Sequence, residues 1–305
     1  NAYFACRLAS KLLEKQPNHP QKGSVTNVIY GFVNHWMEPI KNSFAPLKEG
    51  YLAALEAGDP QFAGWISTNY LRNLYASGNL LAKVREEFDV YTRSMKKKKH
   101  IPALDSILSL YQAILNLSDR TDPSILLDGE VFQEQEVERL ISESSLAPLF
   151  IYYFSKLQLC LMFGDYEKGI EYGDHGHKYV MQQGGLNPIP HFYFYDTLVR
   201  IIQSGNGKNQ DEMKEEGYSR IKKLVENALM NYCYMQYLVE AETAHHSGRA
   251  EKAMTLYEKA VSSAHQNGFF QDEALAYELA GRFYLEKGIV SIAGFHLKEA
   301  HSCYR

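Results

Sequence analysis

The residues with the clearest capacity for chemistry are histidines that lie close to one another or to a carboxylate. Asp174, His175 and His177 fall within four consecutive residues, and His246 directly follows His245. Imidazole and carboxylate groups are common zinc ligands and common acid–base catalysts. Both groups lie in expected helices, where residues one or two positions apart point in different directions. We therefore interpret them as surface histidines, and we expect no catalytic residue, no metal and no cofactor.

Two other segments have the composition of anion-binding sites. Residues 204–209 are rich in glycine and polar residues, but a phosphate-binding loop needs a longer spacing and a preceding strand, so we interpret them as a surface loop. The strongest charge feature is the run Lys96, Lys97, Lys98 and Lys99. Such a run is usually a solvated linker between helices. The alternative is a docking patch for an acidic partner, and salt would then weaken the binding.

The last third of the chain contains one residue pattern twice, in residues 234–267 and 274–305. The first copy carries Tyr237, Ala241, Ala244, Gly248, Ala253, Tyr257 and Ala260, and the second carries Tyr277, Gly281, Tyr284, Gly288, Ala293, Leu297 and Ala300, each 40 residues later. Each central glycine is expected to end a helix, and the alanines let two helices approach closely. This pattern is typical of the tetratricopeptide repeat, whose period is about 34 residues. The longer period predicts longer helices or a longer loop, and we interpret residues 264–272 as that loop.

Most other segments have helical spacing of apolar residues and end at glycine or proline, and no useful strand alternation occurs. The predicted fold is all-α: a superhelical array of antiparallel helix hairpins, or tetratricopeptide-like solenoid. We expect one domain over residues 1–305, with weaker repeat units at 1–117 and 149–228. Because both ends fall inside expected helices, we also expect the chain to be a segment of a longer polypeptide.

Composition argues against several classes of partner. The net charge of −4 gives no reason to expect nucleic acid or a membrane surface. The most apolar stretch, residues 146–163, contains Lys156 and Gln158, which favours a buried helix over a membrane span. The four cysteines are Cys6, Cys160, Cys233 and Cys303, and they lack metal-binding spacing. They are interpreted as reduced thiols of a cytoplasmic protein.

A candidate binding surface follows from the tetratricopeptide pattern, which implies that the first helix of each pair lines a concave groove. Transferred by position, this surface consists of Met235, Leu238, Glu242, His245, Leu275, Glu278, Arg282 and Leu285. Its mixture of apolar and charged residues suits a bound peptide or helix. The alternative is a groove that is exposed to solvent or filled by the parent chain.

A resemblance to a known family is carried by residues 273–285 (EALAYELAGRFYL), by residues 293–300 (AGFHLKEA) and by the ending CYR. The chain resembles the helical-repeat region of very large signalling proteins. These proteins combine a serine/threonine kinase-like domain, an AAA-type (STAND-like) ATPase module, a GAF domain and a sensor histidine kinase. The likeness is loose before residue 230, and the chain lacks a Walker loop, a kinase catalytic loop and a phosphoacceptor-histidine box. The resemblance implies a regulatory or scaffolding segment.

The predicted function is non-catalytic protein–protein interaction and signal relay, with other domains of the same chain or a signalling protein as partner. Binding would change the curvature of the solenoid and so reposition the flanking modules. An alternative is a helical sensor that binds a peptide or small molecule directly, with aromatic residues at 150–154 and 191–195 lining a pocket. An all-α enzyme is a third possibility, but the sequence shows no set of carboxylates or histidines for it.

Overall fold

The computed structural model describes residues 2–16, 19–118, 124–203 and 208–304, and no strand occurs in these ranges. In chain order the helices are α1 (Ala2–Lys15), α2 (Lys22–Val28), the π-helix η1 (Ile29–Val33), the 3-10 helices η2 (Asn34–Trp36) and η3 (Ile40–Ser43), α3 (Phe44–Glu56), α4 (Pro60–Ala76), α5 (Leu81–Lys97), α6 (Ile101–Ser118), α7 (Glu136–Ser142), α8 (Leu146–Phe163), α9 (Tyr166–Val180), α10 (Pro188–Gln203), α11 (Lys208–His246), α12 (Ala250–Asn267), α13 (Phe270–Glu286) and α14 (Val290–Cys303). The all-α prediction is confirmed.

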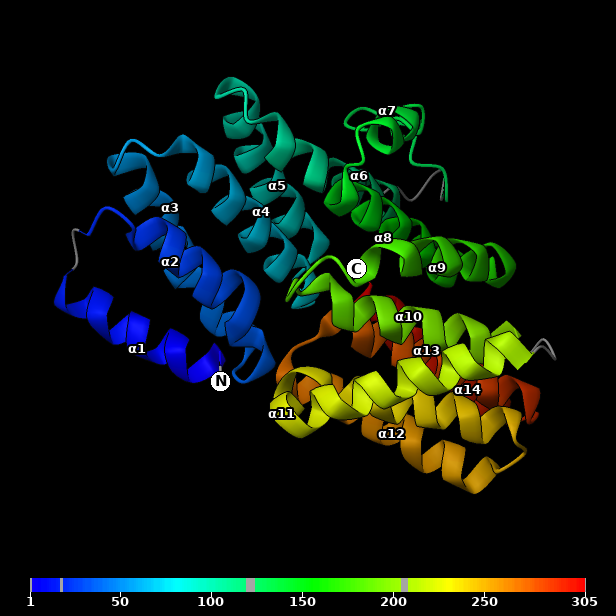
Figure 1. The fold of residues 1–305 in the computed structure, drawn as a ribbon. Helices are drawn as coiled ribbons and strands as arrows, with labels where there is room; N and C mark the ends of the chain where they lie inside the picture. The colour runs from blue at the N-terminus through cyan, green and yellow to red at the C-terminus, as the bar shows by residue number, and fades with distance from the viewer. Residues whose placement is uncertain (1, 17–18, 119–123, 204–207, 305) are drawn as a thin grey trace.

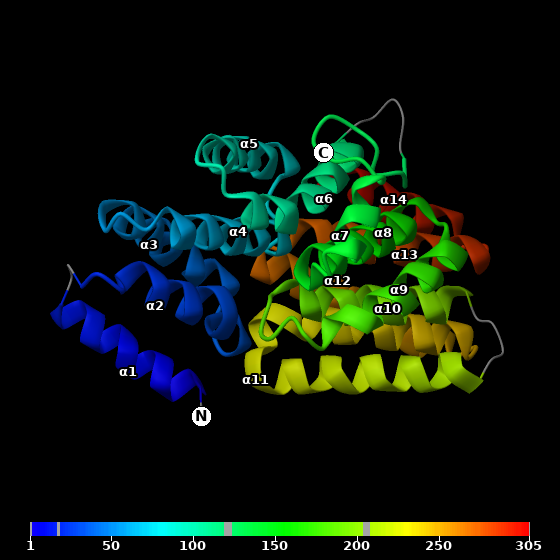
Figure 2. The same ribbon diagram turned by 45° about the horizontal axis from the view of Figure 1, so that its top comes forward.

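Helices that follow one another in the sequence pack in pairs, as α3 does with α4, α8 with α9 and α13 with α14 (Figure 1). Helices α1 to α5 lie on one side of the molecule, and α9 to α14 lie on the other (Figure 2). The main buried core runs through both sides, from Ile40 to Ala293. Helix α8 is long and apolar enough to cross a membrane, yet 72% of it is buried inside the protein, so it is a buried core helix as predicted.

The packing extends beyond neighbouring pairs. In a solenoid each unit contacts only its neighbours, whereas here α4 also contacts α10. The turn after α4 also lies against the turn before α13, because a Cβ on Gly78 would come 2.8 Å from the Cα of Phe269. The finer prediction of a tetratricopeptide-like solenoid is therefore not established by this arrangement.

The long helix α11 bends at Ala228, whose φ of −142° and ψ of 63° are not helical. The part before the bend packs on α10, where a Cβ on Gly217 would come 2.1 Å from the hydroxyl oxygen of Thr197. The part after the bend packs on α12, and the Tyr257 hydroxyl donates to Glu242 across this contact. Residues 229–246 are thus the first helix of the repeat at 234–267.

The predicted glycine turns are present. Gly164, Gly248 and Gly288 have φ values of 78°, 72° and 73°, a conformation in which glycine avoids the clash that a Cβ would make. The predicted loop at residues 264–272 is wrong, because α12 continues to Asn267 and α13 begins at Phe270. Gly268 ends α12 in the left-handed region, and the Phe269 amide then donates to the Ala264 carbonyl at 2.9 Å. The long repeat period therefore comes from long helices.

Candidate functional site

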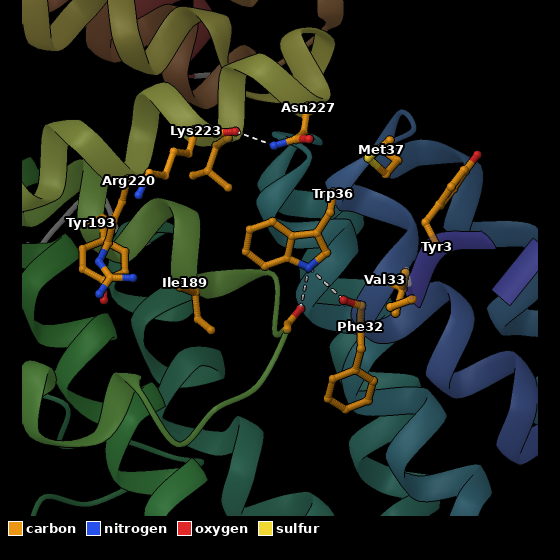
Figure 3. A pocket seen from close by; sticks show the side chains of 13 residues that line it. Tyr3, Phe32, Val33, Trp36, Met37, Ile189, Tyr193, Arg220, Lys223 and Asn227 are labelled. Carbon is orange, nitrogen blue, oxygen red and sulfur yellow. Dashed lines mark hydrogen bonds between the residues drawn. The ribbon is translucent and has the colours of Figure 1, made fainter. Parts of the chain in front are cut away.

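A cleft of about 560 Å³ lies between the N-terminal helices and the α10–α11 pair (Figure 3). This volume falls in the usual range of ligand pockets, about 300–1,000 Å³. One wall comes from α1, η1, η2 and Met37, and the other comes from α10, α11 and Gly185 just before α10. The lining residues are Ala2, Tyr3, Phe32, Val33, Trp36, Met37, Gly185, Ile189, Tyr193, Arg220, Lys223, Leu224 and Asn227.

Trp36 is the largest side chain in the cleft, and the backbone fixes its position. Its indole nitrogen donates to the carbonyl oxygens of Phe32 at 2.8 Å and Gly185 at 3.3 Å. A Cβ on Gly185 would come 2.4 Å from the Phe32 carbonyl oxygen, so this approach requires glycine. The helical path also changes from α to π at Ile29 and to 3-10 at Asn34, which ends the helix beside the cleft.

Asn231 of α11 holds the end of η2 against the second half of the chain. Its side-chain amide donates to the carbonyl oxygens of His35 at 2.8 Å and Glu38 at 2.7 Å, and its oxygen accepts from the Ile40 amide at 3.1 Å. These backbone groups lie in η2, in the turn after it and at the start of η3, and burial without a partner would be costly for them. Asn231 therefore connects the two walls of the cleft through three hydrogen bonds.

Two cations lie at the mouth of the apolar cleft, one helical turn apart on α11. The Arg220 guanidinium lies 4.6 Å from the ring centroid of Tyr193 and pairs with Glu216 at 2.7 Å. Lys223 is exposed. The described lining contains no carboxylate, histidine, cysteine, serine or threonine. The cleft therefore provides apolar contact with positive charge at its edge, which suits binding, and its described lining offers only tyrosine hydroxyls and the Lys223 amine as groups that could act as a nucleophile or general base.

The predicted concave-surface residues do not form an open groove. Met235, Leu238, Glu242 and Leu275 are buried, so the predicted exposure is wrong for them, because the helices around this face cover it. His245 and Glu278 are partly buried. Arg282 donates to the hydroxyl of Tyr166 and to Glu278, and only Leu285 is well exposed, at 47%.

The four lysines of residues 96–99 are exposed at the end of α5. Lys99 adopts a φ of 54° in the turn that leads to α6. Their role as a docking patch for an acidic partner remains a prediction. The glycine-rich segment falls largely on residues 204–207, which lie outside the described residues.

The side chains of Asp174, His175 and His177 do not point to a common centre, as expected. They are not simple surface residues, however. Asp174 and His177 turn towards α10, where they contact Arg200 at 2.6 Å and Asp196 at 2.9 Å. His175 instead stacks on Tyr153, with ring centroids 5.1 Å apart. Asp174 is 59% exposed, whereas Arg200 and Asp196 are buried.

The sequence analysis did not predict the buried pair Asp196–Arg200, although the glycines of α9 indicate the close helix contact at which this pair lies. Glycines at 169, 173 and 176 form one face of α9, and this face lets α10 lie close. A Cβ on Gly173 would come 2.1 Å from the Oδ1 atom of Asp196. Three glycines at helical spacing therefore marked a close helix contact.

The second histidine group does converge, which corrects the interpretation of His245 and His246 as unrelated surface residues. Their ligand atoms and a carboxylate oxygen of Glu242 all lie within 4.8 Å of one another. The reason is that Glu242 lies one helical turn earlier, at the i−3 and i−4 positions that face both residues.

The aromatic segments predicted to line a pocket mostly form core. Phe150 and Phe192 are fully buried and pack on each other with ring centroids 5.5 Å apart. Tyr193 lines the large cleft. Three others line a cavity of about 10 Å³, enough for roughly one water molecule: Phe154, His191 and Tyr195.

That small cavity also contains Asp272, whose carboxylate lies 4.0 Å from the Nε2 atom of His191. Burial raises the pKa of Asp272 to about 7 and lowers the pKa of His191 to about 4. Between these values burial favours the neutral form of both groups, so the contact is not a strong ion pair.

No protein-family model matches this chain, and no curated protein sequence matches it. The resemblance to the signalling proteins therefore stays a prediction, and the functional argument rests on the cleft.

Proposed function

We propose that this protein is a non-catalytic binding module whose cleft docks an acidic protein segment through a bulky apolar side chain. The observation that supports this proposal is the combination of an apolar lining around Trp36 with Arg220 and Lys223 at the mouth. An apolar anchor in a desolvated pocket supplies most of the binding energy at protein interfaces. The two cations favour a negatively charged flank and reject a positively charged one.

The relay function predicted from the sequence becomes part of this proposal. The two walls of the cleft come from residues 2–37 and 185–227, which are far apart in the chain. An occupant that contacts both walls stabilises one relative position of them. Docking would thereby bias the arrangement of the N-terminal helices on α10 and α11, and in the proposed relay this bias is the signal.

A peptide-display selection on the immobilised protein tests the proposal without a known partner. We expect enrichment of sequences that place a large apolar residue beside Asp or Glu. Immobilised Trp36→Ala protein should lose this enrichment. Enrichment of sequences without acidic residues, or equal enrichment on the variant, would contradict the proposal.

The selected peptides should then bind through the predicted residues. Trp65→Phe leaves Trp36 as the only tryptophan, so its fluorescence reports occupancy of the cleft. Reversing both cations in Arg220→Glu/Lys223→Glu should weaken binding about tenfold at low salt, because each exposed charge contributes roughly 0.5–1 kcal/mol. The loss should shrink at high salt. Lys83→Glu/Arg85→Glu reverses two exposed cations on α5 outside the cleft, so it is the matched control and should bind as the parent does.

The same variants distinguish docking of a peptide from the alternative, in which the cleft binds a small molecule. Anilinonaphthalene sulfonate, an amphipathic anion, can be titrated while its fluorescence is followed. If no peptide is selected and this dye binds in a Trp36-dependent way, the cleft is a sensor site for small amphipathic anions. The docking proposal would then be wrong.

A further inference from the structure

A second cluster lies on the last turn of α11 and is formed by Glu242, His245 and His246. The Oε2 atom of Glu242 lies 3.6 Å from Nε2 of His246 and 3.9 Å from Nδ1 of His245. Around a tetrahedral zinc ion with bonds of about 2.0–2.2 Å, neighbouring ligand atoms lie about 3.3–3.5 Å apart. The two distances from Glu242 exceed this spacing by a few tenths of an ångström, and the ligand atoms of the two histidines, which lie within 4.8 Å of each other, would have to draw closer when an ion binds.

Neighbouring helices orient two of these three side chains. The Tyr257 hydroxyl on α12 donates to the Oε1 atom of Glu242 at 2.6 Å, which leaves Oε2 on the side of the histidines. Glu286 on α13 lies 2.8 Å from Nε2 of His245, and this contact turns Nδ1 towards Glu242. A carboxylate on the far nitrogen of a ligand histidine is the usual outer partner in zinc sites. The Tyr257 hydroxyl also lies 3.5 Å from Nδ1 of His245.

Burial and access also fit a cation site. The Glu242 side chain is 3% exposed, and a buried carboxylate that stays ionised requires a nearby positive charge. That charge comes either from protonated imidazoles or from a divalent metal. His246 is 32% exposed and also lines a separate cleft of about 430 Å³, so an ion can reach the cluster from solvent.

The cluster is not part of the repeat pattern. At the equivalent positions 40 residues later, the second copy has Arg282, Leu285 and Glu286. The helix pairing of the repeat therefore does not require Glu242, His245 and His246. The second copy instead supplies Glu286, the residue that orients His245.

We propose that Glu242, His245 and His246 bind a divalent transition metal, with zinc as the best fit. Two imidazoles and one carboxylate suit zinc, and three protein ligands leave a fourth position for water. Through Tyr257 and Glu286 the ion would join α11 to α12 and α13. The bound metal would therefore stabilise the packing of these three helices.

The test is calorimetric titration of the full chain, purified without a polyhistidine tag, with zinc chloride. We expect one zinc ion per chain, a cobalt complex with the strong visible absorption of tetrahedral coordination, and a higher Tm in the presence of zinc. His246→Ala should weaken zinc binding by more than about 100-fold. Glu286→Gln, which changes only the orienting partner, should weaken it about 10–100-fold.

His301→Ala removes an exposed histidine outside the cluster and is the matched control, with unchanged binding expected. His246 is partly exposed, so its replacement keeps the test valid even if a variant of the buried Glu242 does not fold. Absence of zinc binding by the folded parent protein would overturn the proposal. So would binding that is equally strong in His246→Ala, since the ion would then be held elsewhere.

Discussion

Replacing Arg200 by methionine is expected to lower the free energy of unfolding by about 3–5 kcal/mol, because it leaves a buried carboxylate without its cation. Arg200 is 2% exposed and donates to Asp196 at 3.0 Å and to Asp174 at 2.6 Å. The other oxygen of Asp196 contacts His177 at 2.9 Å. Methionine fills similar space but provides no charge. Urea denaturation followed by circular dichroism measures the loss.

Two further variants make this result specific. Asp174→Asn removes the charge of the exposed carboxylate that pairs with Arg200. It should lower the free energy of unfolding by less than about 1 kcal/mol. The double variant Asp196→Asn/Arg200→Met removes both buried charges and should recover part of the stability lost by Arg200→Met. If Arg200→Met alone cost less than about 1 kcal/mol, the network would not stabilise the α9–α10 contact as described.

Asp272→Asn is expected to stabilise the protein by about 3–4 kcal/mol at pH values above 7 and to have little effect near pH 4. Burial raises the pKa of Asp272 from 3.8 to about 7, so the folded state holds this proton more tightly than the unfolded chain does. The carboxyl group therefore favours folding fully below about pH 4, and this contribution is lost as the pH rises towards 7. Asparagine does not ionise and avoids the loss.

The measurement is the difference in urea unfolding free energy between Asp272→Asn and the parent at several pH values. His191 titrates in the same small cavity, but it is present in both proteins, so the difference isolates Asp272 to first order. Glu86→Gln changes an exposed carboxylate on α5 and is the control, for which a small difference is expected at every pH. A difference that does not grow between about pH 4 and pH 7 would contradict the expected cost of burying the carboxylate.

The helices and their turns were accessible from the sequence because their signals are local. Apolar spacing and glycine positions such as Gly248 and Gly288 depend on residues only a few places apart, and the structure bears them out. The loop at residues 264–272 was misjudged because the long period was attributed to a longer loop, whereas the helices are longer. Gly268 and the buried Phe269 make a complete turn in two residues, so the helices on both sides continue.

The candidate sites depended on contacts that no local pattern contains. The cleft forms because Trp36 reaches Gly185, which lies 149 positions later in the chain. The groove residues were misplaced because the prediction assumed an open inner face, whereas the surrounding helices bury Glu242 and Leu275. The cluster of Glu242, His245 and His246 was within reach, since its spacing of three and four residues is helical. The sequence interpretation considered only whether His245 and His246 point towards each other. It did not consider Glu242, which lies one helical turn earlier.

The side chain of Asn231 also has a consequence for synthesis of the protein on the ribosome. Its amide is the partner of the His35 carbonyl, and 196 positions separate the two residues. At translation rates of about 5–20 residues per second, the end of η2 waits roughly 10–40 s for that partner to be made. During this interval water must solvate the backbone of His35, Glu38 and Ile40, and the wall that carries Trp36 lacks its counterpart. The apolar wall of the nascent chain that carries Trp36 therefore stays uncovered until the second half emerges.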